Sequence, residues 1–271
     1  MKVGICVSLE KAPLAVEAGF DYVELSGSEI TQREPWDASV YAGLPIDVTN
    51  LFFPGGVTLF PIDRNDPDNF APNPYIRKAR ERLSELGVEI AVIGSGNQRR
   101  CPPEITFPYE SNMKIDEWKG AQTPEEIFAR IVMWFDRGPG TTIAAPESLE
   151  RSETNVGNDC GMFSRILDDY GVGYTADGYH LLKEWDAEGR EGGRDFPTAE
   201  FWVNQVPHAP LHVHIAQLEG RRSPQPNDPM IEGFFARLKE IGYDARVSLE
   251  CSGLEPEGYA QAMANIKTYF A

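Results

Sequence analysis

The stretch VGYTADGYHLLKEW, residues 172–185, runs from an apolar, strand-like segment into an aspartate, Asp177, and His180 follows three residues later. Similar strand-like runs occur on both sides of this stretch, and helix-like segments separate them. The chain has only four histidines, so a histidine this close to a strand end is a candidate functional residue. The number of strand–helix units decides the fold class.

Strand-like and helix-like signals alternate from one end of the 271 residues to the other. Eight segments have the strand pattern: residues 2–7, 21–25, 46–53, 88–93, 141–145, 172–176, 210–215 and 246–250. No low-complexity linker separates them, and this length is usual for one α/β barrel. We therefore predict an α/β protein with a single (β/α)8 TIM barrel over residues 1–271, rather than a doubly wound sheet.

Local signals indicate where individual helices begin. Asn73 and Pro74 are typical of an N-cap and a first helical residue, and the helix they start is predicted to end at Gly87. Thr123 and Glu126 form a capping box around a proline, which predicts a helix over residues 124–135.

The composition is that of an ordinary globular protein, with 41% hydrophobic and 25% charged residues. No apolar run approaches the roughly 18 to 20 residues that cross a bilayer, and the N-terminal segment lacks the pattern of a signal peptide, so we predict a cytoplasmic protein without a membrane partner. The net charge of −17 repels phosphate backbones, so nucleic acid is not an expected partner. The four cysteines are far apart and form no CxxC pair, which favours reduced thiols.

Two segments that follow strands are too long for plain turns. Residues 52–72 and 99–122 are predicted to lie at the C-terminal rim, where barrel enzymes build their sites. Aromatic residues assigned to the long rim segments could form apolar walls for a sugar ring or chain, or could belong to the core or to a subunit contact; they include Phe52, Phe53, Trp118 and Trp202.

Polar side chains stand at the ends of four consecutive predicted strands: Glu147, Asp177, His214 and Glu250. Because neighbouring strands lie about 4.8 Å apart, side chains that point inward from their ends can converge on one ion. A single acidic residue after a strand is more often a helix N-cap or a solvated charge. Three buried carboxylates together would be strongly unfavourable without a cation. This donor set suits Mn²⁺ or Mg²⁺ and would also accept Co²⁺.

Two further histidines, His208 and His212, precede the candidate ligand His214 in the sequence. His212 and His214 are two residues apart, so both should face the same side of the strand. His214 is nearer the strand end and is the better ligand. We expect His212 to lie deeper, as a hydrogen-bonded core histidine or as support for the ligands. His208 lies beside a proline-rich turn and is predicted to be structural.

At these residues the chain resembles the xylose isomerase-like TIM-barrel superfamily, and within it the sugar phosphate isomerase/epimerase group that includes D-tagatose and D-psicose 3-epimerases. The resemblance covers nearly the whole chain at low similarity, and its specific part runs from residue 147 to residue 250. It implies that Glu147 in APESLERSETN, Asp177 in ADGYH, His214 in HVHIA and Glu250 in SLE hold the metal.

The same resemblance implies the other roles in the site. Glu147 and Glu250 would be the catalytic pair, and Glu153, His180 and Arg221 would bind substrate. The spacing from the last histidine to the arginine is one residue longer than in relatives, so Arg222 is an alternative to Arg221. Relatives often have Glu-Pro-Leu-Asn at the first ligand, whereas here a proline precedes Glu147. Arg99, in GSGNQRRCP, either reaches the substrate or is a solvated turn residue.

The implied function is that of a metal-dependent sugar isomerase or epimerase, which abstracts a proton next to a carbonyl through a metal-stabilised enediolate. Mn²⁺ is the preferred ion, with Mg²⁺ or Co²⁺ as alternatives, and the partner is a small-molecule carbohydrate. An inosose dehydratase-like lyase and a non-catalytic sugar-binding barrel are the competing interpretations, and a homo-oligomer is compatible with each. An apurinic endonuclease would need additional histidines from early strands, and no histidine precedes His180.

Overall fold

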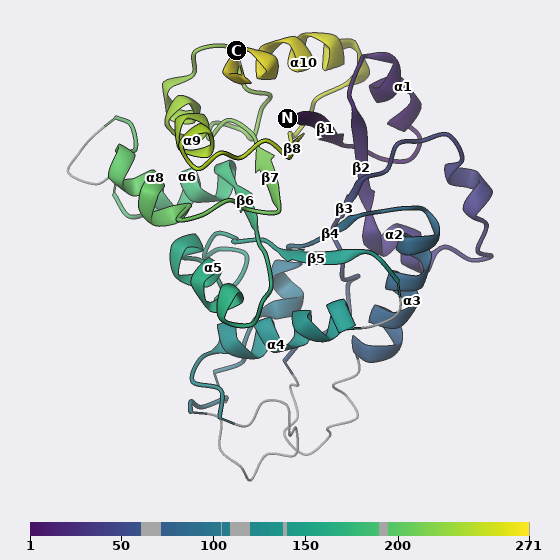
Figure 1. Ribbon diagram of the computed structural model, residues 1–271, viewed down its shortest axis with the longest axis vertical. Coiled ribbons are helices and arrows are strands. Elements are labelled where there is room, and N and C mark those ends of the chain that lie inside the picture. Colours follow the sequence, from purple (N-terminus) through teal and green to yellow (C-terminus); the bar gives the residue numbers. More distant parts are fainter. Residues whose placement is uncertain (61–71, 104, 109–119, 138–139, 190–194, 271) are drawn as a thin grey trace.

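The computed structural model describes residues 1–270 except residues 61–71, 104, 109–119, 138–139 and 190–194 (Figure 1). The eight predicted strands are confirmed: β1 Lys2–Cys6, β2 Tyr22–Ser26, β3 Val48–Asn50, β4 Ile90–Ile93, β5 Ile143–Pro146, β6 Thr175–Asp177, β7 His212–Ile215 and β8 Arg246–Leu249. They form one sheet in the order β5-β4-β3-β2-β1-β8-β7-β6, and every neighbouring pair is parallel.

The sheet closes on itself between its two outer strands. An isolated parallel bridge joins Glu147 to Thr175, and the Thr175 hydroxyl donates a hydrogen bond to the Ala145 carbonyl at 3.1 Å. The helices surround this sheet (Figure 1): α1 Ala12–Glu17, α2 Gly27–Gln32, α3 Pro72–Glu85, α4 Pro124–Arg137, α5 Cys160–Asp169, α6 Gly178–Ala187, α8 Ala199–Gln205, α9 Pro229–Glu240 and α10 Tyr259–Lys267. The predicted (β/α)8 TIM barrel is confirmed.

Helix starts follow the local signals, with small shifts. The capping box at α4 is present, because Glu126 N–H donates to the Thr123 hydroxyl at 3.2 Å. The reciprocal bond reaches one residue further back, where the Glu126 carboxylate accepts from Gln122 N–H at 2.9 Å. Helix α3 begins at Pro72, before the predicted Asn73–Pro74 pair. Proline is tolerated there because the first-turn N–H groups have no partner within the helix.

Alternation along the strands separates two apolar regions. A small cluster lies inside the barrel and contains Tyr22, Val48, Ile90, Val92 and Ala145. The larger cluster lies between the strands and the helices and includes Val3, Ile5, Val213 and Ile215. Residues of one strand thus point alternately into the barrel and out toward the helices. This alternation places His212 and His214 inside, together with Glu24.

None of the helices in the described part of the chain is long and apolar enough to span a membrane.

Candidate active site

The four predicted ligands meet at the C-terminal end of the barrel. Glu147 directly follows β5, Asp177 ends β6, His214 lies on β7 and Glu250 directly follows β8. One potential ligand atom from each of the four side chains lies within 4.8 Å of the corresponding atoms of the other three. The Nδ1 atom of His214 lies 2.9 Å from Glu250 Oε2 and 3.2 Å from Glu147 Oε1. The geometric part of the sequence prediction therefore holds, and metal binding by these residues stays a prediction.

The two carboxylate oxygens of Asp177 have different surroundings. Its Oδ1 accepts a hydrogen bond from Tyr179 N–H at 2.7 Å and caps α6. Its Oδ2 is buried and accepts no hydrogen bond among the described residues, although His180 Nε2 lies 3.4 Å away. Asp177 therefore caps α6 through Oδ1, and its Oδ2 stays available to a cation.

A divalent cation fits this donor set. Glu250 Oε2 also lacks a hydrogen bond of good geometry, even though Arg221 Nη2 lies 2.8 Å from it. The arginine balances the charge of this oxygen, and a carboxylate oxygen has further lone-pair directions that a cation can use. Three carboxylates and one imidazole form a mostly oxygen site of the kind that Mn²⁺ and Mg²⁺ prefer.

The electrostatics of the cluster reflect its burial. Burial raises the pKa of Glu147 to about 7, and the nearby Glu250 carboxylate adds to this, while His214 opposes it. Burial also disfavours ionisation of Asp177, but His180 and Arg221 lower its pKa below the usual value. Burial opposes protonation of His214, yet the Glu24 and Glu250 carboxylates raise its pKa well above the usual value.

A carboxylate that the sequence analysis missed lies behind His214. Glu24, on β2, is fully buried, and its Oε1 lies 2.9 Å from His214 Nε2. Its Oε2 lies 3.1 Å from His212 Nε2, which confirms His212 as a hydrogen-bonded interior histidine. Although burial disfavours its charge, the two histidines lower the pKa of Glu24. The available signal was a glutamate in the strand segment 21–25, in register with the interior Tyr22.

A cavity of about 400 Å³ opens above the four-residue cluster. Glu147 and Glu250 lie in its wall together with the three predicted substrate-binding residues, Glu153, His180 and Arg221. Other lining residues come from the end of β3 and from the chain after β3 and β4, and they include Asn50, Leu51, Phe53 and residues 94–98. The structure thus brings all predicted site residues except Asp177 and His214 to the surface of one cavity, and those two lie beneath it.

The turn geometry distinguishes the two arginines after β7. Arg221 has a positive φ of 51°, which directs its side chain back over the cluster, and its Nε donates to the Glu250 carbonyl at 3.1 Å. The guanidinium also lies over the Tyr179 ring, 4.8 Å from its centroid. Arg222 is exposed and does not line the cavity. The residue placed at the cavity is therefore Arg221.

Arg99 neither lines the cavity nor lies in solvent, so both sequence predictions for this residue are wrong. Its side chain is fully buried, and Nη1 donates to the Glu147 carbonyl at 2.6 Å. The guanidinium carbon lies 5.2 Å and 5.7 Å from the ring centroids of Phe128 and Phe163. Arg99 therefore holds the backbone of Glu147 from behind, away from the cavity, because the 3-10 turn Gly96–Arg99 directs it inward.

The aromatic residues singled out in the sequence separate into two groups. Phe53 lines the cavity, whereas Phe52 and Trp202 belong to the core, with exposed fractions of 0% and 1%. Trp118 lies outside the described residues.

Comparisons with known proteins agree with this architecture. The family model described as xylose isomerase-like TIM barrel matches residues 12–269. No curated protein sequence matches the chain. A D-psicose 3-epimerase from Clostridium cellulolyticum H10, solved with D-tagatose, has a TM-score of 0.66 and 17% identity, over 98% of this chain and 91% of that one.

Two other solved structures share the fold. The IolI protein with a bound zinc atom has a TM-score of 0.60 and 16% identity, over 99% of this chain and 96% of that one. Endonuclease IV from Thermus thermophilus has a TM-score of 0.61 and 13% identity, over 100% of this chain and 99% of that one. At these identities the likeness of individual structures concerns the fold, and the match over residues 12–269 carries the assignment. The chain belongs to the xylose isomerase-like TIM-barrel family.

Proposed function

We propose that the protein is a divalent-metal-dependent isomerase or epimerase of sugars or sugar derivatives. The observation that carries the proposal is the convergence of Glu147, Asp177, His214 and Glu250 within 4.8 Å beneath a cavity of about 400 Å³. The D-psicose 3-epimerase that shares the fold supports it. Mn²⁺ is the proposed ion, with Mg²⁺ or Co²⁺ as substitutes. The zinc in the IolI protein makes zinc a further ion to test.

Glu147 and Glu250 are the proposed catalytic residues. A bound divalent cation would supply electrostatic stabilisation of the negative charge that develops on a carbonyl oxygen during proton abstraction. Glu147 would remove a proton from the adjacent carbon, because coordination to the cation favours its ionised form, which can act as a base. Glu250 would return a proton that it has taken up from solvent, and Glu147 would release the abstracted proton to solvent. Return to the same carbon from the other face inverts that centre, and return to the neighbouring carbon interconverts aldose and ketose.

The remaining cavity residues would orient the sugar. His180 Nε2 lies 3.8 Å from Glu147 Oε1, so a hydroxyl or carbonyl bound to His180 would lie close to the base. Arg221 Nη2 lies beside Glu250, which places a permanent positive charge next to the proposed acid. Glu153 lines the same cavity and can accept hydrogen bonds from hydroxyl groups.

An uncharged sugar fits the described cavity wall better than a sugar phosphate. Among the described lining residues, Arg221 is the one permanently cationic side chain, and it is already paired with Glu250 at 2.8 Å. Phosphate groups are usually bound by several free cationic or N–H donors. The lining residues Asn50, Asn97 and Gln98 instead carry amides that bind hydroxyl groups.

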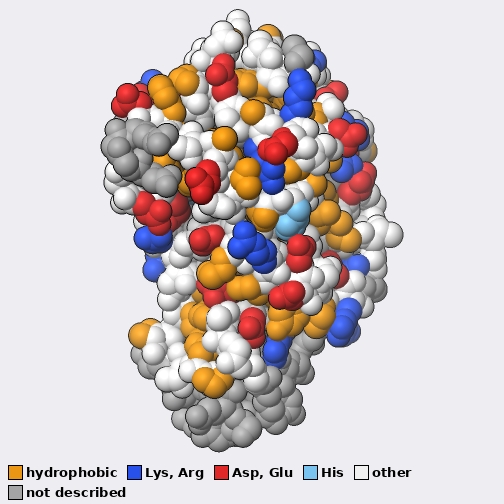
Figure 2. Space-filling model, turned by 60° about the vertical axis from the view of Figure 1, so that its left-hand side comes forward, with side chains coloured by type: hydrophobic (Ala, Val, Ile, Leu, Met, Phe, Trp, Pro, Cys, Tyr) orange, Lys and Arg blue, Asp and Glu red, His pale blue; other side chains and the backbone are white. Residues whose placement is uncertain are grey.

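A nuclease function has less support, even though endonuclease IV shares the fold. The chain has four histidines in all and a net charge of −17, whereas DNA binding depends on cationic contacts with phosphates. Acidic and basic side chains are interspersed on the face shown in Figure 2. A cytoplasmic location and a homo-oligomeric state stay predictions.

Proton exchange in D₂O tests the proposal. The Mn²⁺-loaded protein is incubated with a panel of free ketoses, aldoses and inososes, the ion is removed, and carbon-bound deuterium is followed by NMR. We expect deuterium at a carbon next to the carbonyl of at least one sugar, and its loss in Glu147→Gln. Release of water with a new enone absorbance would identify a dehydratase instead. Sugar binding by calorimetry without exchange in any compound would contradict the catalytic proposal and favour the non-catalytic barrel.

A further inference from the structure

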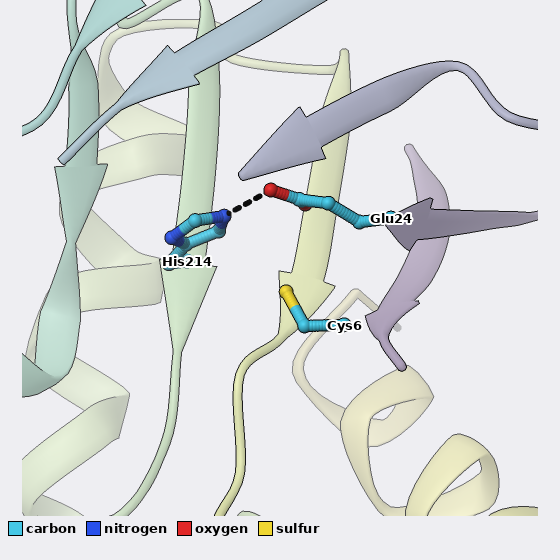
Figure 3. A group of neighbouring side chains, drawn as sticks. All are labelled: Cys6, Glu24 and His214. Atoms are coloured by element: carbon cyan, nitrogen blue, oxygen red, sulfur yellow. Dashed lines mark hydrogen bonds and ion pairs between the residues drawn. The ribbon is translucent and has the colours of Figure 1, made fainter. Parts of the chain in front are cut away.

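A buried carboxylate on β2 faces the candidate metal cluster from the other side of the barrel interior. Figure 3 shows Glu24 and His214 pointing toward each other, with Cys6 beside them. Glu24 has no exposed surface, and both of its oxygens are used, at 2.9 Å from His214 Nε2 and 3.1 Å from His212 Nε2. An unpaired buried charge would be strongly unfavourable, so the two imidazole partners are what allow this carboxylate to be fully buried.

These contacts determine which nitrogen of each ring carries hydrogen. An ionised carboxylate can only accept hydrogen bonds, so both histidines must donate from Nε2. The lone pair of a neutral His214 ring then lies on Nδ1. That atom is 2.9 Å from Glu250 Oε2 and 3.2 Å from Glu147 Oε1, at the centre of the proposed ligand set.

We propose that Glu24 is a positioning residue of the metal centre: it holds His214 in the Nε2–H tautomer and fixes the ring so that Nδ1 faces the ion. This inference rests on the metal centre proposed above. His212 supports this arrangement, because its Nε2–H donates to the second carboxylate oxygen of Glu24. The centroids of the His212 and His214 rings lie 4.9 Å apart, and the ring planes make an angle of 89°. Without Glu24, the His214 ring is free to turn or to protonate Nδ1, and the ion loses a preoriented ligand.

Cys6 offers the alternative interpretation. Donor atoms of Cys6, Glu24 and His214 also lie within 4.8 Å of one another, as in a small metal site. In that case Nε2 of His214 would coordinate an ion instead of donating to Glu24. The number of bound ions and the tautomer of His214 separate the two interpretations.

Metal affinity of matched variants tests the proposal. Free Mn²⁺ is measured by electron paramagnetic resonance during titration of the wild-type protein, Glu24→Gln, Glu24→Ala and the control Tyr22→Phe. Tyr22 points into the same interior from the same strand and bonds Ser248 at 2.8 Å, so its variant reports general damage to the interior. We expect one ion per wild-type chain, affinity lowered about 10- to 100-fold in the Glu24 variants, and no change in Tyr22→Phe.

A measurement on the wild-type protein keeps the proposal testable if the Glu24 variants do not fold. Long-range ¹H–¹⁵N NMR of the Mg²⁺-loaded protein should show His214 protonated at Nε2 with the ion-dependent shift at Nδ1. An Nδ1–H tautomer, two ions per chain, or unchanged affinity in both folded Glu24 variants would overturn the role of Glu24. Absence of ion binding by the wild-type protein would instead refute the metal centre of the proposed function.

Discussion

The two halves of the barrel contribute different things to one site. Strands β5 to β8 carry, at or next to their C-terminal ends, the four charged or imidazole side chains of the proposed ligand set: Glu147, Asp177, His214 and Glu250. Strands β1 to β4 have, at or just after their ends on the same rim, small or uncharged residues: Cys6, Ser26, Asn50 and Gly94. In the proposed site, the second half would supply the metal ligands, while the first half would leave space for a substrate and support His214 from behind through Glu24.

Gly94 shows why the small residues of the first half matter. A Cβ atom at this position would lie 2.5 Å from Glu147 Oε2, closer than nonbonded atoms approach. The absence of a side chain after β4 therefore allows the carboxylate after β5 to occupy its place. The position of the Glu147 carboxylate therefore depends on the missing side chain at Gly94 in the other half of the barrel.

The largest expected effect comes from a proposed metal ligand of the second half, Asp177. Asp177→Asn keeps an oxygen that can accept from Tyr179 N–H and cap α6, but it removes the negative charge from the cluster. We expect Mn²⁺ affinity to fall on the order of 10³-fold, the loss of roughly 4 kcal/mol of binding energy, in a protein that still folds. Calorimetric titration with Mn²⁺ measures this.

The matched control for this variant is Asp159→Asn. Asp159 caps α5 in the same way, by accepting from Met162 N–H at 2.8 Å, and it does not belong to the cluster. Equal affinities of Asp177→Asn and Asp159→Asn would show that Asp177 acts as a cap alone.

The second prediction concerns pH. Burial raises the pKa of Glu147 to about 7, and the pKa of His214 is raised by Glu24 and Glu250 against the effect of burial. In the metal-free protein, Glu147 and His214 therefore carry protons at pH 6 that a bound ion must displace. The affinity for Mn²⁺ should accordingly increase with pH. Between pH 6 and pH 8 we expect Mn²⁺ affinity to increase on the order of 10²-fold. A constant dissociation constant across this range, by the same titration, would contradict proton displacement from the cluster.

The third prediction tests the space that the first half leaves. Gly94→Ala should push Glu147 out of position and lower Mn²⁺ affinity about tenfold, with a smaller change in thermal stability. Gly55→Ala is the control, because a Cβ at Gly55 meets nothing within 4 Å. If both alanine variants bind Mn²⁺ as the wild type does, the close approach of Gly94 to Glu147 is not needed for the site.

The smallest effect is expected at the rim of the first half. Leu51 is 58% exposed, has a positive φ of 43° and lines the cavity. Asparagine tolerates this backbone conformation, so Leu51→Asn removes apolar surface without added strain. Once a substrate is known from the exchange experiment, we expect KM to increase about fivefold, roughly 1 kcal/mol, with kcat and metal affinity unchanged. A large fall in kcat would place Leu51 in the chemistry rather than in the wall.

The two halves of the barrel also differ in how much of the candidate site could be predicted from the sequence. The convergence of Glu147, Asp177, His214 and Glu250 could be predicted, because each lies at or next to the end of a strand and consecutive parallel strands are neighbours in a barrel. The contribution of the first half depends on contacts across the interior, such as Glu24 with His214, which are separated by 190 residues. No local pattern encodes such a pairing. The inward turn of Arg99 and the positive φ of Arg221 likewise depend on backbone conformation in the loops.

Anomalous X-ray diffraction from a Mn²⁺-loaded crystal tests the shared cation most directly. We predict a single strong peak bonded to Glu147, Asp177, His214 Nδ1 and Glu250, at roughly 2.0 to 2.3 Å from each ligand atom. A peak located elsewhere, or no peak after loading at a pH where the carboxylates are ionised, would contradict a common ion at these four residues.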